Sequence, residues 1–282
     1  MFKKSYDLNK ELFDISENSI YRSHEDLYAW YKFDQDVSSD GNLRDSSGNG
    51  RKLKPKGGAT DRPLAPVADT PGSLGFQKFS TEFDNDLLVT DEGADIAFPN
   101  GFTFSTWVKF NTVGSVIHSL AYIGNNQFAA GDHSLNIYYQ NTSIERLFVR
   151  VGDADSTAYL GRVSRLTGTP LSSGVWYHIA VTYDGTTNAS GIIIYLNGVD
   201  ISSGALGYDN SSGVFSTMTS PPDARYCIGN FYNESTTYDF DGLISENALW
   251  SKKFSSTEVS SLYSLASFSN ALAISRRAYT GF

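Results

Sequence analysis

The sequence predicts an all-β protein, a two-sheet antiparallel jelly-roll sandwich with one short C-terminal helix and terminal arms. Three observations support this prediction. Short runs of alternating residues recur along the chain, turn residues separate them, and a capped helical pattern appears only near the end. The composition agrees, because 14% of the 282 residues are aromatic, only 19% are charged, and 25 are glycine.

The expected strands begin at 27–33 (LYAWYKF), which alternates, and continue at 87–90, 102–110, 116–123, 135–139, 146–151, 176–183, 192–196, 226–228 and 240–249. In 176–183 the odd positions carry Tyr177, Ile179, Val181 and Tyr183, which is typical of a strand buried mainly on one face. Asn197-Gly198 then predicts a type I′ hairpin turn, because both residues tolerate positive φ. The run 49–73 has no period and four prolines, so we expect a long surface loop there.

The predicted helix follows these strands. Ser255 is placed to cap it and Glu258 to close a capping box, with Phe254 and Val259 at the flanking staple positions. We expect the helix to pack at the edge of the sandwich. The chain then divides into an N-terminal arm (1–25), the jelly-roll domain (26–266) and a C-terminal arm (267–282).

Charge and cysteine content exclude several function classes. The net charge of −9 opposes nucleic-acid binding, and no apolar run approaches the ~20 residues of a membrane-spanning helix. Cys227 is the single cysteine, so no internal disulfide is possible. The start of the chain lacks the apolar core of a signal peptide, and we expect folding in a reducing cytoplasm.

Several motifs occur in a familiar order: YKFD, DSSGNG, FDND followed by LLV, FTFSTWVKF, GVWYHIAVTYDG, IYLNG, CIG, DGLISENALW and FSSTEV. With them the chain resembles the laminin G-like, or concanavalin A-like, lectin jelly-roll superfamily, especially its bacterial and viral branch, over 26–266. The resemblance implies two curved sheets and a role in carbohydrate binding or adhesion, although some relatives are glycoside hydrolases or lyases. Ser245 and Asn247 depart from the family pattern, which often has an acid and an apolar residue there.

One acidic motif could carry catalysis. Glu82, Asp84 and Asp86 are two residues apart, so one strand would place all three carboxylates on one face. Related retaining glycosidases use a Glu-x-Asp-x-Glu row as nucleophile and acid. The competing interpretation is the strand lead-in of non-catalytic family members, and we favour it. We therefore expect no enzymatic activity and no catalytic residue.

A second acidic cluster is a candidate calcium site. Asp34, Asp36, Asp40 and Asp45 crowd a loop that offers carboxylate and carbonyl oxygens, which calcium prefers. The alternative is that these residues only shape turns. No other cofactor is expected.

Aromatic and amide side chains in loops suggest glycan binding, because sugars stack on aromatic faces while amides bind their hydroxyls. The candidates are Tyr138, Tyr139, Asn141, Tyr208, Phe231, Tyr232, Asn233 and Tyr238. The alternative for each is packing within the sandwich. Trp107 is expected on the strand face opposite Phe104 and Val108, and His178 as a hydrogen-bonded residue of the sheet.

The leading hypothesis is a non-enzymatic lectin-like surface or assembly protein, namely a virion (phage) structural, decoration or fibre-associated protein at the particle surface. It would bind cell-surface glycan or neighbouring structural proteins, and a homo-oligomer is compatible with it. The arms would dock through anchors that include Phe2, Leu12, Arg276, Arg277 and Phe282. The alternatives are a secreted, extracellular bacterial carbohydrate-binding module and, third, a glycoside hydrolase or polysaccharide lyase.

Overall fold

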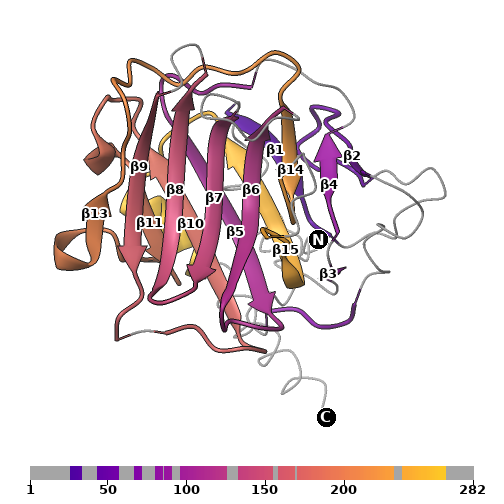
Figure 1. The fold of residues 1–282 in the computed structure, drawn as a ribbon. Helices are drawn as coiled ribbons and strands as arrows, with labels where there is room; N and C mark the ends of the chain where they lie inside the picture. Colours follow the sequence, from indigo (N-terminus) through magenta and orange to yellow (C-terminus); the bar gives the residue numbers. More distant parts are fainter. Residues whose placement is uncertain are drawn as a thin grey trace, which may run out of the picture.

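The computed structural model describes residues 26–33, 43–56, 67–71, 80–84, 86–90, 96–125, 133–154, 158–168, 170–231 and 237–264. Within these residues, two antiparallel sheets lie face to face and enclose one large apolar core (Figure 1). The predicted all-β sandwich is therefore confirmed. Both predicted arms, 1–25 and 267–282, lie outside the described residues, and so do all five proposed docking anchors.

The first sheet, sheet A, has seven strands in the described part of the chain. Their order is β1 (Leu27–Tyr31), β15 (Asp241–Trp250), β5 (Phe102–Phe110), β10 (Trp176–Tyr183), β11 (Ile193–Leu196) and β12 (Val199–Asp200), and β3 (Thr81–Asp84) pairs with the beginning of β15. The two-residue hairpin between β11 and β12 is confirmed. Asn197 and Gly198 have φ of 51° and 78°, and Leu196 pairs with Val199.

The second sheet, sheet B, has eight strands among the same residues. Their order is β13 (Gly207–Asp209), β9 (Ala158–Arg165), β8 (Glu145–Asp153), β7 (His133–Asn141), β6 (Val116–Gly124), β14 (Arg225–Ile228), β4 (Leu88–Thr90) and β2 (Leu53–Pro55). Two short 3-10 turns interrupt the strands: η1 (Ala189–Gly191) connects β10 with β11 of sheet A, and η2 (Gly204–Leu206) connects β12 of sheet A with β13 of sheet B. The long neighbours β6 to β9 form the broad front of the molecule (Figure 1).

Several strands, including β2, β9 and β13, were not among those expected from the sequence. The strand β9 was not expected, because its inward positions include Arg162 and Ser164, which break the apolar alternation. At this edge of the sandwich both polar side chains bond to backbone carbonyl groups, Arg162 to Ser202 and Ser164 to Ile201. The loop predicted over 49–73 contains β2, in which Leu53 is fully buried in the core.

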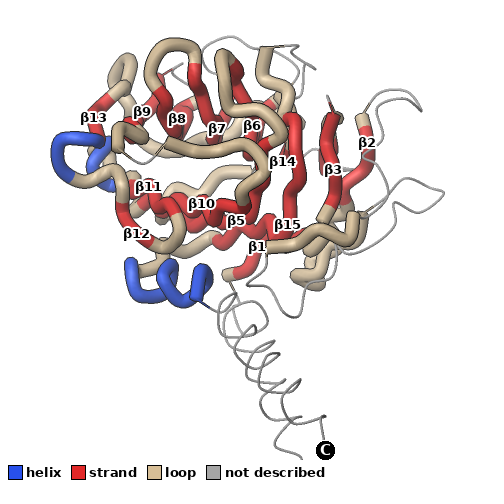
Figure 2. Tube along the Cα trace, turned by 90° about the horizontal axis from the view of Figure 1, so that it is seen from below, coloured by secondary structure: helices blue, strands red, loops and turns tan. Residues whose placement is uncertain are grey.

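The helix of residues 256–264 lies over the outer face of sheet A rather than at the edge of the sandwich (Figure 2). Val259 and Leu262 join a second apolar cluster with residues of that face, including Trp30 and Trp250. The outer face of sheet A therefore needs a cover, and the apolar side of the helix supplies it. No helix among the described residues is long and apolar enough to cross a membrane.

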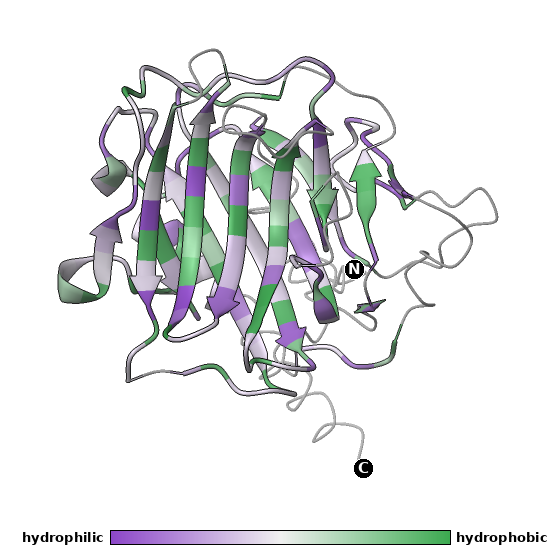
Figure 3. Ribbon diagram, in the orientation of Figure 1, coloured by the Kyte–Doolittle hydropathy of each residue, from purple (hydrophilic) through white to green (hydrophobic). Residues whose placement is uncertain are grey.

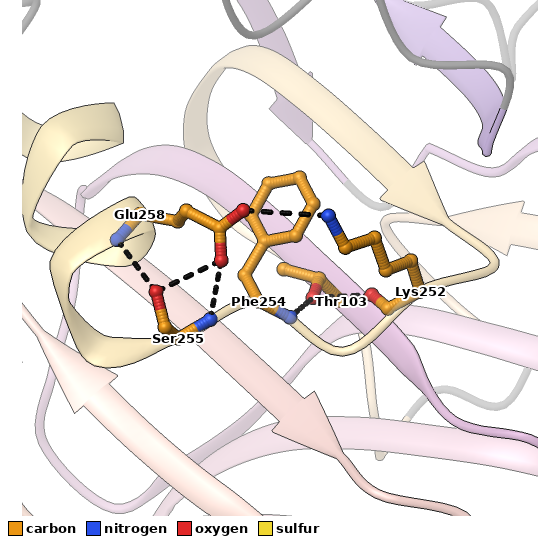
Figure 4. Close-up of polar contacts among 5 residues, drawn as sticks. All are labelled: Thr103, Lys252, Phe254, Ser255 and Glu258. Atoms are coloured by element: carbon orange, nitrogen blue, oxygen red, sulfur yellow. Dashed lines mark hydrogen bonds and ion pairs between the residues drawn. The ribbon is translucent and has the colours of Figure 1, made fainter.

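The predicted capping box at the start of this helix is confirmed (Figure 4). The Ser255 hydroxyl accepts a hydrogen bond from the Glu258 backbone N–H at 3.3 Å, and the Glu258 carboxylate accepts one from the Ser255 N–H at 2.6 Å. The preceding residue, Phe254, donates its N–H to the Thr103 hydroxyl of β5 at 2.8 Å. These bonds join the start of the helix to sheet A.

The departure from the family pattern at Asn247 has a structural partner. The Tyr226 hydroxyl of sheet B donates a hydrogen bond to Asn247 Oδ1 of sheet A at 2.6 Å, and both side chains are buried. This hydrogen bond accommodates the polar side chain of Asn247 at a position where the family pattern often has an apolar residue. The register of β15 also shifts between Ser245 and Ala248, where Glu246 has a φ of 51°.

Candidate functional site

The candidate site is the outer face of sheet B, the face directed away from the core. Alternation along β7 and β8 sends Leu135, Ile137, Leu147 and Val149 inward and leaves the residues between them on the outer face. The outward-facing residues of these strands include aromatic and cationic side chains as well as uncharged polar ones. Both strands alternate between hydrophobic and hydrophilic residues along their length (Figure 3). In register across β6, β7 and β8 lie Tyr122, Asn136 and Arg150.

Aromatic rings form a continuous row across this face. Tyr138 of β7 stacks on Phe148 of β8, with ring centroids 4.7 Å apart and planes 4° from parallel. Tyr238 meets Tyr138 edge-on at 5.8 Å and lies 4.1 Å from Phe231, which in turn lies 4.9 Å from Tyr122. The row thus joins the middle of sheet B to the segment that connects β14 with β15.

Three arginines lie on the same face, each beside an aromatic ring. The Arg150 guanidinium lies 4.8 Å from the Tyr159 ring centroid and 5.9 Å from that of Tyr138. Arg165 lies 4.9 Å from the Tyr208 ring, and Arg146 lies 6.0 Å from the Phe148 ring. These distances are within the range of cation–π contacts. Within the described ranges, no ion pair neutralises any of the three arginines.

Burial and charge on this face change the titration of its side chains. Burial raises the pKa of Tyr138 to about 12, and the nearby Arg150 charge opposes part of that rise. Burial also lowers the pKa of His133 to about 4, and Arg150 adds to the effect. The His133 ring lies 6.1 Å from the Tyr122 ring. At neutral pH the face therefore carries neutral rings and positively charged guanidinium groups. The central rings are buried, whereas Tyr159, Tyr208 and Tyr238 are partly exposed.

Several buried polar atoms of this face have no hydrogen-bond partner. They are Asn136 Oδ1, Ser134 Oγ, His133 Nε2, Arg146 Nε and Arg150 Nε. Asn136 is only 1% exposed. Buried polar atoms are paired in the great majority of cases. Unpaired ones also lie on sheet A, among them Trp107 Nε1 and Thr182 Oγ1, but on this face they lie beside the rings and guanidinium groups that a ligand would contact.

Four of the predicted glycan-binding residues come together on this face: Tyr138, Tyr208, Phe231 and Tyr238. Two others do not. Tyr139 points into the core, where its hydroxyl lies 2.9 Å from both Val113 O and Glu145 Oε1, and Asn141 Nδ2 donates to Val113 O at 2.7 Å. Both have structural roles between loops. Tyr232 and Asn233 lie outside the described residues.

Sequence reasoning missed the cationic part of the site. Arg146, Phe148 and Arg150 occupy alternate positions of one strand, so a period of two places them on one face. That spacing was a usable signal. Asn136 and Tyr159 carried no comparable signal, because only strand pairing brings them beside Arg150.

A family model described as the concanavalin A-like lectin/glucanases superfamily matches residues 82–260, which is well over half of the chain. The chain belongs to this superfamily. No curated protein sequence matches it. The two-sheet sandwich and the order of the sequence motifs both agree with this assignment.

Solved structures of the same superfamily fold include domain 4 of AbnA, a GH43 extracellular arabinanase from Geobacillus stearothermophilus, in complex with arabinotriose. It is 18% identical with a TM-score of 0.55, and the match covers 84% of this chain and 98% of that one. The binding domain of Paraclostridial Mosquitocidal Protein 1 is 14% identical with a TM-score of 0.55, covering 85% and 52%. The receptor binding domain of botulinum neurotoxin D is 12% identical with a TM-score of 0.53, covering 84% and 52%. This chain thus spans about half of the two toxin domains, and all three likenesses show the fold.

The acidic row that some superfamily glycosidases use is not continuous here. β3 ends at Asp84, and the buried Asp86 beyond it accepts a hydrogen bond from the Asp84 N–H at 3.1 Å. Asp86 therefore does not extend the face that carries Glu82.

The calcium prediction rests largely on residues outside the described ranges, namely Asp34, Asp36 and Asp40. The fourth, Asp45, is buried and accepts hydrogen bonds from the backbone N–H groups of Trp30, Ser47 and Arg51 at 2.9–3.1 Å. Both Asp45 oxygens are thus used in shaping the turn. Where the chain is described, no group of three or more His, Cys, Asp or Glu side chains is arranged to hold a metal ion.

Proposed function

We propose that this chain is a non-enzymatic carbohydrate-binding protein and that the outer face of sheet B is its sugar-binding surface. The observation that supports this most is the row of stacked rings beside unpaired polar atoms on one face. Of the rings on this face, Tyr159, Tyr208 and Tyr238 are partly exposed and provide apolar surface for a sugar, while the buried rings support them from below. The guanidinium groups provide hydrogen bonds to sugar hydroxyls. The arabinanase domain with the same fold was solved in complex with arabinotriose, and the toxin domains are described as binding domains.

Tyr208→Ala is expected to weaken glycan binding about 5- to 30-fold, the equivalent of one lost aromatic contact of about 1–2 kcal/mol. Tyr208 is partly exposed on β13 and lies beside Arg165, so part of its ring is available to a ligand. The measurement is binding to an array of plant, bacterial and animal oligosaccharides, followed by calorimetry with the best ligand. Val214→Ala is the matched control, because Val214 is 90% exposed and belongs to none of the apolar clusters.

The same experiment tests the absence of catalysis. The best ligand, incubated with the protein and analysed by chromatography, should remain full length, and Glu82→Gln should bind it as the unaltered protein does. Binding to no oligosaccharide would overturn the proposed function. Shortened products that disappear in a folded Glu82→Gln protein would replace it with hydrolase or lyase activity.

We further propose that the protein acts at the surface of a virus particle, where it binds host glycan while its termini contact neighbouring structural proteins. An adhesion-type fold with a single, fully buried cysteine suits a protein that folds in a reducing cytoplasm. Burial raises the pKa of Cys227 far above its usual range, so this thiol is unreactive in the folded protein.

The proposed place at the surface of a virus particle is tested separately from glycan binding. Antibody labelling of particles purified from the source of this chain should decorate their capsid or fibres in electron micrographs. A protein lacking 1–22 and 268–282 should fold and bind glycan but fail to incorporate. Normal incorporation of the truncated protein would contradict docking through the termini, and recovery only in culture medium, free of particles, would favour a secreted module.

A further inference from the structure

We propose that Arg150 binds the carboxylate of an acidic sugar, so that the ligand is a glycan containing uronic or sialic acid residues. This inference rests on the proposed function, because it names the class of glycan that the outer face of sheet B takes.

Arg150 is flanked by two aromatic rings but has no hydrogen-bonding or charged partner among the described residues. Tyr159 and Tyr138 lie 4.8 Å and 5.9 Å from its guanidinium, and the two rings hold the group in place without neutralising it. No hydrogen bond or ion pair joins the guanidinium to another described residue, and its buried Nε lacks a partner. A planar, oriented and unpaired guanidinium is suited to two parallel hydrogen bonds with a carboxylate.

A second, independent observation concerns Asn136, which pairs with Arg150 across β7 and β8. Asn136 is 1% exposed, and its Oδ1 atom has no hydrogen-bond partner. An amide oxygen is an acceptor only, so it requires a donor such as a sugar hydroxyl. The Asn136 acceptor and the Arg150 cation lie side by side. A sugar ring that carries both a hydroxyl and a carboxylate would contact both.

The positive charge of this face is opposite in sign to the net charge of the whole protein. The chain carries a net charge of −9, yet Arg146, Arg150 and Arg165 share one face without a neutralising carboxylate among the described residues. The overall field repels anions, so an acidic ligand must gain its affinity from local contacts at this face. Guanidinium groups also donate to neutral hydroxyls, but a carboxylate gives the stronger, charge-assisted pair.

The experiment compares each acidic glycan with its own neutral form. Oligogalacturonate, alginate oligosaccharides and a sialylated lactosamine are immobilised beside carboxyl-reduced derivatives of the same molecules. We expect at least one acidic member to bind at least tenfold more tightly than its reduced partner. Arg150→Gln should weaken that binding 10- to 100-fold and remove the preference, as expected for one lost charge-assisted pair.

Two variants separate charge from geometry. Arg150→Lys keeps the charge but not the planar pair of donors, and it should recover only part of the affinity. Arg44→Gln removes an exposed arginine elsewhere on the protein and should change affinity less than twofold. Circular dichroism and the melting temperature verify that each variant is folded.

The outcomes are distinguishable. Equal binding of acidic and reduced forms, or a preference that survives in Arg150→Gln, overturns the acidic-sugar inference and leaves the proposed glycan binding intact. Binding to neither form of these glycans, nor to any on the wider array, overturns both.

Discussion

Trp250→Ala is expected to lower the free energy of unfolding by about 3–5 kcal/mol, the usual cost of truncating a large buried aromatic side chain. Trp250 ends β15, is fully buried, and lies 4.9 Å from the Phe254 ring within the apolar cluster beneath the helix. Removing its ring leaves a cavity between sheet A and the helix. Urea unfolding followed by fluorescence and circular dichroism measures the loss.

Two further variants localise the effect. Leu262→Ala removes an apolar side chain from the helix side of the same cluster, and it should cost about 2–4 kcal/mol. Val214→Ala, at a 90% exposed position, should change the stability by less than about 0.5 kcal/mol. A loss below about 1 kcal/mol for Trp250→Ala would mean that the helix contributes little to the folded unit.

The second large effect is a loss of stability in acid that depends on His178. Its side chain is fully buried on β10, where Nε2 lies 2.8 Å from Ser105 Oγ and Nδ1 has no partner. Burial lowers its pKa from 6.5 to about 3 in the folded protein. The unfolded chain therefore binds a proton near pH 6.5 that the folded protein accepts only near pH 3.

Because the unfolded state binds more protons in this window, the contribution is complete above pH 6.5 and decreases as the pH falls toward 3. Between about pH 7 and pH 5 His178 alone should cost about 2 kcal/mol. His133, whose pKa is lowered to about 4, adds a loss of the same sign.

The test is the pH dependence of urea unfolding in the unaltered protein and in His178→Gln. The variant is expected to be less stable at neutral pH, because Ser105 loses its partner, but its stability should fall less between the two pH values. His133→Gln serves as the matched variant for the other buried imidazole. An identical pH dependence in all three proteins would show that neither histidine stays neutral through burial.

The sequence by itself determined the features that depend on neighbouring residues. Alternation identified the long strands, Asn197-Gly198 identified the hairpin, and Ser255 with Glu258 identified the helix start. Each depends on a local period, a local φ preference or a hydrogen bond between residues three apart. Trp107 illustrates the same point, because alternation alone placed it on the face opposite Phe104.

Only the tertiary structure decided what lies beside each outward-facing side chain. Alternation with Leu135 and Ile137 favours Tyr139 as the inward residue and Tyr138 as the outward one, but it does not show which rings pack around Tyr138. The helix position was equally undetermined, because nothing local shows that the outer face of sheet A is apolar enough to need a cover. The candidate site joins Asn136 and Arg150, which pair across the β7–β8 hairpin, to Tyr238, which meets Tyr138 from the segment before β15. The contact with Tyr238 is long-range, and such contacts leave no trace in the short spacings that a single sequence displays.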